Sequence, residues 1–389
     1  MMTLLADDLT SALDGAAPFA ARGLSARVVL DPSGLGEPRA DVVAIDLDSR
    51  FASPGEAEAR FRGAAERLPD AAIVYKTIDS TLRGNLSAEI QGALRGSGRA
   101  RAVVAPAFPA AGRTTVAGRQ LLHGVPLEHT AFARDPRTPV ETSIVAERLA
   151  GLERARFSVH DAERDRDLDA LVAAIGLESD VVWVGSPGLA AALARAIPHR
   201  EASRPAFEPA NGERALVVLG SLHPANDSQV ERLVRAGARM VELPSGEGDV
   251  DPAAIASQIV RGFASGPLVC LRSPRAVSER GRSEREHAAR GHAAAAEMAE
   301  RMGAVVRCCA EEFDSLVATG GDTARRIVDA LGASALDLMG EVEPGVPFGV
   351  LRRPRRAIPF STKAGGFGDA ETLLRCVHRL HTHEDEPSP

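Results

Sequence analysis

Residues 72–94, AIVYKTIDSTLRGNLSAEIQGAL, contain a strand pattern, a polar loop and a helical pattern in immediate succession. The run 72–76 is apolar until it ends in Lys76, and 87–94 carries apolar residues at helical spacing. A strand followed by a helix is the repeating unit of a parallel sheet covered on both faces. Ligands bind such sheets at the carboxyl ends of the strands. The stretch therefore predicts both a fold class and the loop in which to look for a site.

The same alternation continues on both sides of this segment. In the first half the sequence predicts strands at 3–6, 26–30, 42–46, 102–105 and 181–184 and helices at 54–68 and 187–197. Residues 204–212 are rich in Pro, Asn and Gly, which is typical of a linker. Beyond them we expect strands at 214–219, 268–271, 304–308 and 315–318 and helices at 228–236, 278–302 and 370–380. We predict two α/β domains, 1–207 and 208–389, each with a mostly parallel sheet flanked by helices.

Composition narrows the class of protein. Lys and Arg number 46 against 53 Asp and Glu, a net charge of −7, which disfavours a nucleic-acid partner. The four cysteines show no C-x-x-C spacing, and no apolar run approaches the roughly 18 residues of a membrane span. Acidic residues stand where a signal peptide would have its basic region. A cytoplasmic protein with small-molecule ligands is expected, and a homo-oligomer stays possible.

Two polar loops of the first half carry residues suited to binding or turnover of a small hydroxy acid. Asp7 and Asp8 follow the first predicted strand, either as helix-capping residues or as carboxylates that bind or deprotonate a hydroxyl. In the loop 76–85, Lys76 and Arg83 can hold the carboxylate of a ligand. Asp79 and Ser80 can form hydrogen bonds with its hydroxyl groups, or they can serve only to cap the next helix.

Glycine-rich loops dominate the second half. Gly320 and Gly321 follow a predicted strand and precede a helix, and the loop 363–369 adds Lys363 to three glycines. Helix N-termini and backbone N–H groups of this kind bind phosphate. A third such loop at 220–223 favours a nucleotide site, although glycines also serve tight turns. The Walker A string and a clean G-x-G-x-x-G are both missing from the sequence.

Several strings together resemble a known family. In chain order these are ADDLTSALD (6–14), DLDSR (46–50), KTIDSTLRGN (76–85), APAFPAAGRTT (105–115), ATGGDTA (318–324), EPGVPFG (343–349) and KAGGFG (363–368). The ordered set is similar to the four-carbon acid sugar kinases, which include 3-oxo-tetronate and threonate kinases. Three positions depart from the family pattern: Ser11 replaces Gly, Leu47 replaces Thr and Thr77 replaces Lys.

The resemblance implies an N-terminal domain that binds the sugar acid and a C-terminal domain that binds ATP with Mg²⁺. It implies that the ATP-binding residues are Ser221, Gly320, Gly321, Asp322, Thr323, Lys363, Gly365 and Gly366. It implies that the sugar acid lies near Asp8, Arg50, Lys76, Asp79, Ser80 and Arg83. The Mg²⁺ ligands stay unassigned.

The resulting hypothesis is an ATP-dependent kinase for a hydroxyl of a four-carbon acid sugar of the 3-oxo-tetronate, threonate or erythronate class. Asp8 or Asp79 would orient or deprotonate that hydroxyl, and Arg50, Lys76 and Arg83 would hold the substrate carboxylate. The alternatives are a non-catalytic sensor of nucleotide and sugar acid, for which the changes at Ser11 and Leu47 leave room, and a phosphatase or hydrolase, disfavoured because no activated nucleophile is visible.

Overall fold

The structure is a computed structural model of the 389-residue chain. It describes residues 2–30, 40–67, 72–135, 138–177, 180–198, 207–220, 225–244, 251–274, 284–365 and 367–382. The chain divides into two compact units, Met1–Pro205 and Ala206–Pro389, here called the N-terminal and C-terminal units. No helix within the described ranges is both long enough and apolar enough to cross a lipid bilayer.

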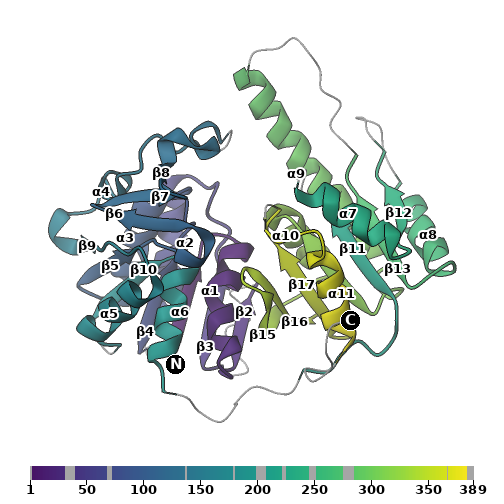
Figure 1. Ribbon diagram of the computed structural model, residues 1–389, viewed down its shortest axis with the longest axis horizontal. Helices are drawn as coiled ribbons and strands as arrows, with labels where there is room; N and C mark the ends of the chain where they lie inside the picture. Colours follow the sequence, from purple (N-terminus) through teal and green to yellow (C-terminus); the bar gives the residue numbers. More distant parts are fainter. Residues whose placement is uncertain are drawn as a thin grey trace. The chain divides into compact units, whose positions relative to one another are not determined.

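The N-terminal unit is built on a parallel sheet (Figure 1). In spatial order its strands are β2 (Ala26–Val29), β3 (Val42–Asp46), β1 (Met2–Ala6), β4 (Ile73–Thr77), β10 (Val181–Gly185), β5 (Arg101–Ala105) and β9 (Phe157–Val159). Helix α6 (Pro187–Ala196) packs against α1 (Leu9–Ala21) and α5 (Asp165–Ile175), and α2 (Pro54–Glu66) packs against α3 (Leu86–Ser97). The two groups cover opposite faces of the sheet, as expected for crossovers that run in opposite directions along it.

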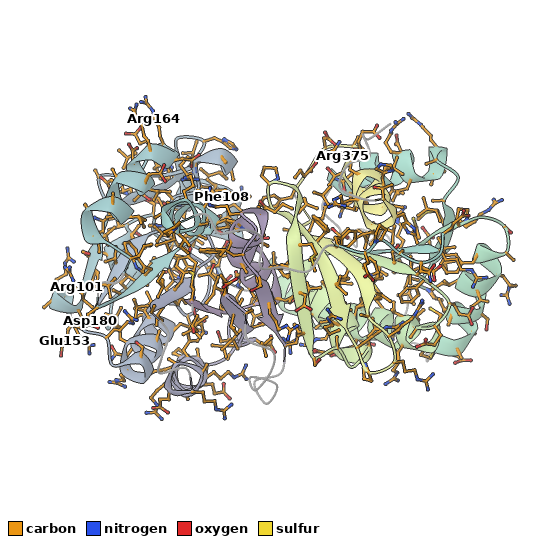
Figure 2. The ribbon with its side chains drawn as sticks, turned by 90° about the horizontal axis from the view of Figure 1, so that it is seen from below. Arg101, Phe108, Glu153, Arg164, Asp180 and Arg375 are labelled. Atoms are coloured by element: carbon orange, nitrogen blue, oxygen red, sulfur yellow. The ribbon has the colours of Figure 1, made fainter. Side chains whose placement is uncertain are left out.

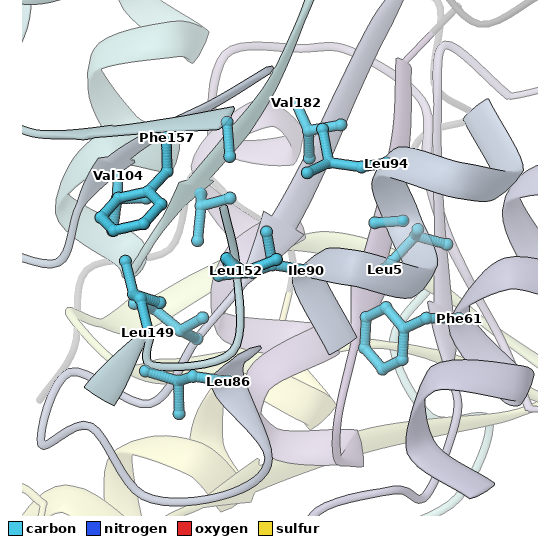
Figure 3. Packing of buried hydrophobic residues seen from close by; sticks show 14 of the residues in the cluster. Leu5, Phe61, Leu86, Ile90, Leu94, Val104, Leu149, Leu152, Phe157 and Val182 are labelled. Carbon is cyan, nitrogen blue, oxygen red and sulfur yellow. The ribbon is translucent and has the colours of Figure 1, made fainter. Parts of the chain in front are cut away.

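Apolar side chains of α2 and α3 form the core on one face of this sheet (Figure 3). Phe61 of α2 and Ile90 and Leu94 of α3 are buried together with Leu5 of β1 and Val182 of β10. The spacing of Ile90 and Leu94 places both on one side of α3, which fixes that helix, and hence the loop before it, against the strands. A small antiparallel sheet of β6 (Arg113–Val116), β7 (Arg119–Leu122) and β8 (Val125–Pro126) follows β5.

The C-terminal unit repeats the architecture with a mixed edge. Its strands lie in the order β12 (Arg239–Glu242), β13 (Leu268–Arg272), β11 (Ala215–Leu219), β14 (Ser315–Thr319), β17 (Ile358–Lys363), β16 (Val346–Arg352) and β15 (Ala335–Glu343). The pairs from β12 to β17 are parallel, whereas β16 and β15 join antiparallel. Helix α9 (Glu284–Cys308) packs on α8 (Pro252–Phe263) and α10 (Gly321–Ala330), and α11 (Thr372–His381) packs on α7 (Ala225–Arg235). The predicted fold class is confirmed in both units.

One predicted element is wrong. Residues 304–308, expected as a strand, form the last turns of helix α9. Met302, Val305, Val306 and Cys309 are buried at spacings of three and four, which is the helical period. Sequence reasoning also did not predict the hairpin β15–β16, helix α8 or strand β12.

An aromatic cluster joins the first described residue of the C-terminal unit to its last helix. The Phe207 ring meets the Phe348 ring edge-on at 5.3 Å between centroids. The Arg379 guanidinium of α11 lies 5.0 Å from the first centroid and 4.3 Å from the second. The Ala210 N–H also donates to the Leu380 carbonyl at 2.9 Å. Residues at the start of this unit are therefore held by residues at its end.

Candidate functional site

The predicted acid-sugar residues follow three adjacent strands of the N-terminal unit. Strand β1 lies between β3 and β4, and all three are parallel, so their following loops share one edge of the sheet. Helix α1 leaves β1 on one face, whereas α2 and α3 leave β3 and β4 on the other. This is a topological switch point, the place where open parallel sheets bind ligands.

Arg50 draws the first two loops together. The N–H groups of Ser49 and Arg50 donate to the Asp7 carbonyl at 2.8 and 3.2 Å. The Arg50 side chain then donates from Nε to Asp7 Oδ2 at 2.7 Å and from Nη2 to Asp7 Oδ1 at 3.1 Å. Its Nη1 forms an ion pair with Asp8, and Nη2 also donates to Ser11 Oγ at 2.8 Å. Arg50 thus bridges both carboxylates, and Ser11, where the family pattern has Gly, supplies one of its acceptors.

The two adjacent carboxylates differ in their ionisation. Burial alone would raise the pKa of Asp7, but Arg50 and Lys76 hold that pKa below its ordinary value. Burial and the neighbouring Asp7 charge raise the pKa of Asp8, against the lowering effect of Arg50. The Asp8 side chain is 24% exposed and that of Asp7 only 1%. Asp8 is therefore the carboxylate of the pair with both the access and the basicity to accept a proton.

Asp8 also caps helix α1. Its Oδ1 accepts a hydrogen bond from the Ser11 N–H at 2.7 Å, the standard N-cap geometry. One Asp8 oxygen thus caps α1 while the other pairs with Arg50, and a catalytic role for this carboxylate stays a prediction.

The third loop holds Asp79 and Arg83 as a tight pair. Arg83 Nε donates to Asp79 Oδ2 at 2.5 Å, and Thr81 Oγ1 donates to the same oxygen at 2.5 Å. Although burial opposes ionisation, Arg83 and Arg50 keep the pKa of Asp79 well below its ordinary value. Arg83 also reaches Asp135 Oδ2 from Nη1 at 3.2 Å and lies over the Phe132 ring. This pairing makes Asp79 a poor proton acceptor and a good anchor for Arg83.

Lys76 points into the protein. Its side chain is 1% exposed, its Nζ lies 2.7 Å from Glu89 Oε2, and it donates to the Thr77 carbonyl at 2.7 Å. Ser49 Oγ donates to Glu89 Oε1 at 2.7 Å, so this buried pair also supports the loop that carries Arg50. Lys76 lowers the pKa of Asp7 through its charge. Its contacts suit a supporting role, and direct contact with substrate stays a prediction.

Ser80 lies beside these groups and is buried. Its carbonyl accepts a hydrogen bond from Gln120 Nε2 of β7 at 2.9 Å, and Thr115 Oγ1 donates to Gln120 Oε1 at 2.7 Å. The small antiparallel sheet thus fixes the position of the Asp79–Ser80 segment.

In the C-terminal unit, loops again follow three adjacent parallel strands, β11, β14 and β17. Gly320 follows β14 as the N-cap residue of α10, with φ +90°, and it has no side chain to cap the first-turn N–H groups of that helix. A β-carbon on Gly220 would lie 1.9 Å from Thr323 Oγ1, so only glycine fits between β11 and α10. Asp322 is exposed on the first turn of α10. These features suit an anion at this helix terminus.

Lys363 ends β17 beside this helix start. Its carbonyl accepts from the Gly320 N–H at 3.0 Å. Its buried ammonium donates to Asn226 Oδ1 at 3.1 Å and to the carbonyls of Ala364 and Gly365, both at 3.3 Å. Burial lowers the pKa of Lys363 to about 8. The ammonium is held by long contacts to neutral acceptors, a setting that an added anion would improve.

Two buried polar atoms near these loops accept or donate no hydrogen bond among the described residues: Gln229 Oε1 and Thr319 Oγ1. Thr319 immediately precedes Gly320, and Gln229 Nε2 donates to the Phe367 carbonyl at 3.2 Å. Such orphan atoms are costly unless a ligand or water satisfies them. A bound nucleotide fits this donor set.

A charged network fixes the start of α11 after the third loop. Arg375, labelled in Figure 2, donates from Nε to Glu343 Oε2 at 3.0 Å and pairs with Asp369 at 2.8 Å. Thr372 Oγ1 donates to Glu343 Oε1 at 2.7 Å. The loop after Lys363 is thereby attached to β15 as well as to α11.

The predicted residues fall into distinct groups. Asp8, Arg50, Lys76, Asp79, Ser80 and Arg83 lie together in the N-terminal unit, and Gly320, Gly321, Asp322, Thr323, Lys363 and Gly365 lie on neighbouring loops of the C-terminal unit. Ser221 and Gly366 fall outside the described residues. Sequence reasoning assigned no role to Glu89 or Asp135. The sequence 135–139, with prolines at 136 and 139, predicts a rigid turn that contains Asp135, but nothing in it indicates the pairing with Arg83.

Comparison with known proteins supports the two halves of this description. Residues 2–154 match the family model of a sugar-binding N-terminal domain, and residues 216–373 match that of a nucleotide-binding C-terminal domain. A solved structure from Salmonella typhimurium superposes with TM-score 0.80, covering 96% of this chain and 98% of that one. It carries the provisional description of a tRNA synthase, and at 21% identity it bears on the fold alone. The chain thus matches the model of a sugar-binding domain followed by the model of a nucleotide-binding domain.

Curated relatives define the family more closely. A D-threonate kinase of Salmonella typhimurium is 34% identical over 97% of this chain and 98% of its own length. A 3-oxo-tetronate kinase of Methylobacterium radiotolerans is 32% identical, and a D-erythronate kinase of Heliobacterium modesticaldum is 30% identical. These cover 97% and 98% of this chain and 98% and 97% of their own lengths, respectively. The chain belongs to the four-carbon acid sugar kinase family.

Proposed function

We propose that this protein is an ATP-dependent kinase that phosphorylates a hydroxyl of a four-carbon acid sugar of the threonate, erythronate or 3-oxo-tetronate class. The observation that carries the proposal is the difference between the Asp7 and Asp8 carboxylates at the switch point of the N-terminal unit. There, Arg50 bridges two adjacent carboxylates, of which Asp8 has a raised pKa and access to solvent. Family membership supplies the reaction class.

Phosphoryl transfer needs an oriented nucleophile and neutralised phosphate charge. In the proposed reaction the substrate hydroxyl oxygen attacks the γ-phosphorus of ATP, the β–γ bridge bond breaks, and ADP leaves. Asp8 accepts the hydroxyl proton. A carboxylate whose pKa is raised is the better base, because its basicity is closer to the operating pH. Asp79, with its depressed pKa, holds Arg83 in place instead.

The nucleotide is proposed to bind the C-terminal unit. The first-turn N–H groups of α10, after Gly320, would hold phosphate oxygens, and Lys363 would neutralise them from behind the loop. Mg²⁺, which binds ATP kinases through substrate phosphates and one or two carboxylates, would neutralise the triphosphate when bound. Asp322 on the first turn of α10 is the carboxylate that fits this position.

D-threonate is the first substrate to test, since the D-threonate kinases among the relatives reach 34% and 35% identity over 97% and 99% of this chain. The deciding assay couples ADP release to a spectrophotometric signal with D-threonate, D-erythronate and 3-oxo-tetronates as acceptors. Turnover of at least one supports the proposal, and no turnover on any of them refutes it. Calorimetric binding of ATP and sugar acid without turnover would instead indicate a sensor. Because ATP is its co-substrate, we place the enzyme in the cytoplasm, as a monomer or homo-oligomer.

A further inference from the structure

Arg83 has two carboxylate partners of different kinds. Asp79, four residues away, accepts from Nε at 2.5 Å and from the Arg83 backbone N–H at 3.4 Å. Asp135 comes from a separate segment after the 3-10 helix η4 (Ala131–Arg134) and meets Nη1 at 3.2 Å. Phe132 of η4 lies under the guanidinium, 5.3 Å from its carbon to the ring centroid. Asp79 and Phe132 therefore orient the Arg83 guanidinium without help from Asp135.

The Asp135 contact is the weaker of the two. It is longer, both side chains are partly exposed (27% for Arg83 and 20% for Asp135), and the contact spans separate segments. The other Asp135 oxygen, Oδ1, accepts from the Thr138 N–H at 2.9 Å, so the carboxylate has a second attachment that does not depend on Arg83. A partly exposed ion pair of this type contributes little free energy and exchanges readily.

Arg50 and Lys76, the other two predicted cations, are paired more tightly with carboxylates than Arg83 is with Asp135. Arg50 makes a two-point contact with Asp7 at 2.7 and 3.1 Å and pairs with Asp8 as well. Lys76 is enclosed with Glu89 at 2.7 Å. Among these cations in the described N-terminal unit, Arg83 is the one whose carboxylate partner an incoming acid can replace at least cost.

We propose that Asp135 is an internal competitor of the substrate: its carboxylate occupies on Arg83 the position that the carboxylate of the sugar acid takes on binding. The inference rests on the proposed function, because it deepens the acid-sugar site. Exchange of one carboxylate for another preserves the charge around Arg83, so an acid can displace Asp135. A neutral polyol offers no such replacement and leaves Asp135 in place. Asp135 therefore weakens the binding of acids and leaves the binding of the corresponding alcohols unchanged.

The test is calorimetric binding of D-threonate and of the neutral alcohol D-threitol in the absence of ATP. Asp135→Asn removes the competing charge and keeps the oxygen that caps the turn at Thr138. Asp161→Asn is the matched control, because Asp161 also caps a turn, accepting from the Ala117 and Gly118 N–H groups at 2.7 and 2.8 Å, and the substitution changes net charge equally. We expect Asp135→Asn to lower the Kd of D-threonate by about two- to fivefold and to leave D-threitol unchanged.

Equal affinities in Asp135→Asn and wild type, tighter binding of both ligands, or the same gain in Asp161→Asn would overturn the inference. Failure of wild type to bind D-threonate would overturn it too. A melting temperature within a few degrees of wild type shows that the variant is folded, and Thr138→Ala, which leaves Asp135 charged, should not reproduce the gain. Binding without turnover in the presence of ATP would refute the kinase proposal alone, so the two ideas fail separately.

Discussion

Replacing Asp8 with Asn tests the proposed base while sparing the helix cap. Asn is as good an N-cap residue as Asp, so its side-chain oxygen can still accept from the Ser11 N–H that lies 2.7 Å from Asp8 Oδ1. What the variant loses is the ability to accept a proton, together with the negative charge that pairs with Arg50. Removal of a general base lowers the rate by about 10²- to 10⁴-fold, which is the expected fall in kcat on D-threonate.

Although Asp8→Asn should lower the rate, it should not lower the stability of the folded protein. Because the pKa of Asp8 is raised in the folded protein, its stabilising contribution is fully present below the unfolded pKa and is lost as pH rises through the folded pKa. The ionised form thus costs stability at neutral pH, and the neutral Asn relieves this cost. The melting temperature of Asp8→Asn should equal or exceed that of wild type.

The assay is coupled ADP release, with ATP affinity measured by calorimetry and melting followed by circular dichroism. Asp251→Asn provides the matched control: Asp251 caps α8 by accepting from the Ala253 N–H at 2.9 Å, in the other unit. It should leave kcat unchanged. In wild type, kcat/KM should fall as pH drops through the pKa of Asp8, which lies above the ordinary value for an aspartate. A kcat for Asp8→Asn within tenfold of wild type would refute the role of Asp8 as base.

Three further predictions concern the supporting residues. Since the pKa of Lys363 is about 8 without ligand, ATP binding at pH 8 should raise that pKa, and the protein should take up about half a proton. The uptake is visible as a difference between the uncorrected binding enthalpies in phosphate and in Tris buffer, and equal uncorrected enthalpies would argue against it. Lys76→Met leaves Glu89 buried without its cation and should lower the free energy of unfolding in urea by about 3 kcal/mol. The double variant Lys76→Met with Glu89→Gln should recover part of this loss. If the effects of the two substitutions on the free energy of unfolding simply add, the pairing is contradicted. Gly220→Ala forces a β-carbon against Thr323 and should weaken ATP binding. Gly266→Ala should leave ATP binding unchanged, because nothing lies within 4 Å of a β-carbon at that position. Equal effects of the two substitutions on ATP affinity would contradict the packing argument.

Strand and helix alternation was sufficient to predict the fold class, because buried parallel strands are read directly from apolar runs such as that of β3, Val42–Asp46. It failed at residues 304–308, because a short apolar run has the same composition at the end of a buried helix as in a strand. The hairpin β15–β16 gave no such alternation with helices and was missed.

Loop chemistry predicted residues that lie close together in each unit, since polar side chains after parallel strands share one edge of the sheet. The residues that pair with these side chains could not be predicted from the sequence. Pairing of Arg50 with Asp7 spans 43 residues and that of Lys76 with Glu89 depends on how α3 docks, so neither follows from local spacing. Lys76 and Lys363 were predicted to bind ligand, which stays a prediction, and the structure shows that both ammonium groups also contact buried protein acceptors.

The contact of Phe207 with Arg379 and Phe348 has a consequence for synthesis on the ribosome. The segment that opens the C-terminal unit stays without its partners until the final helix has emerged from the exit tunnel. This unit can therefore complete its native packing only after α11 has emerged, whereas the described strands of the N-terminal unit are available far earlier. Nascent chains halted before Arg379 should expose that aromatic pair to chaperones.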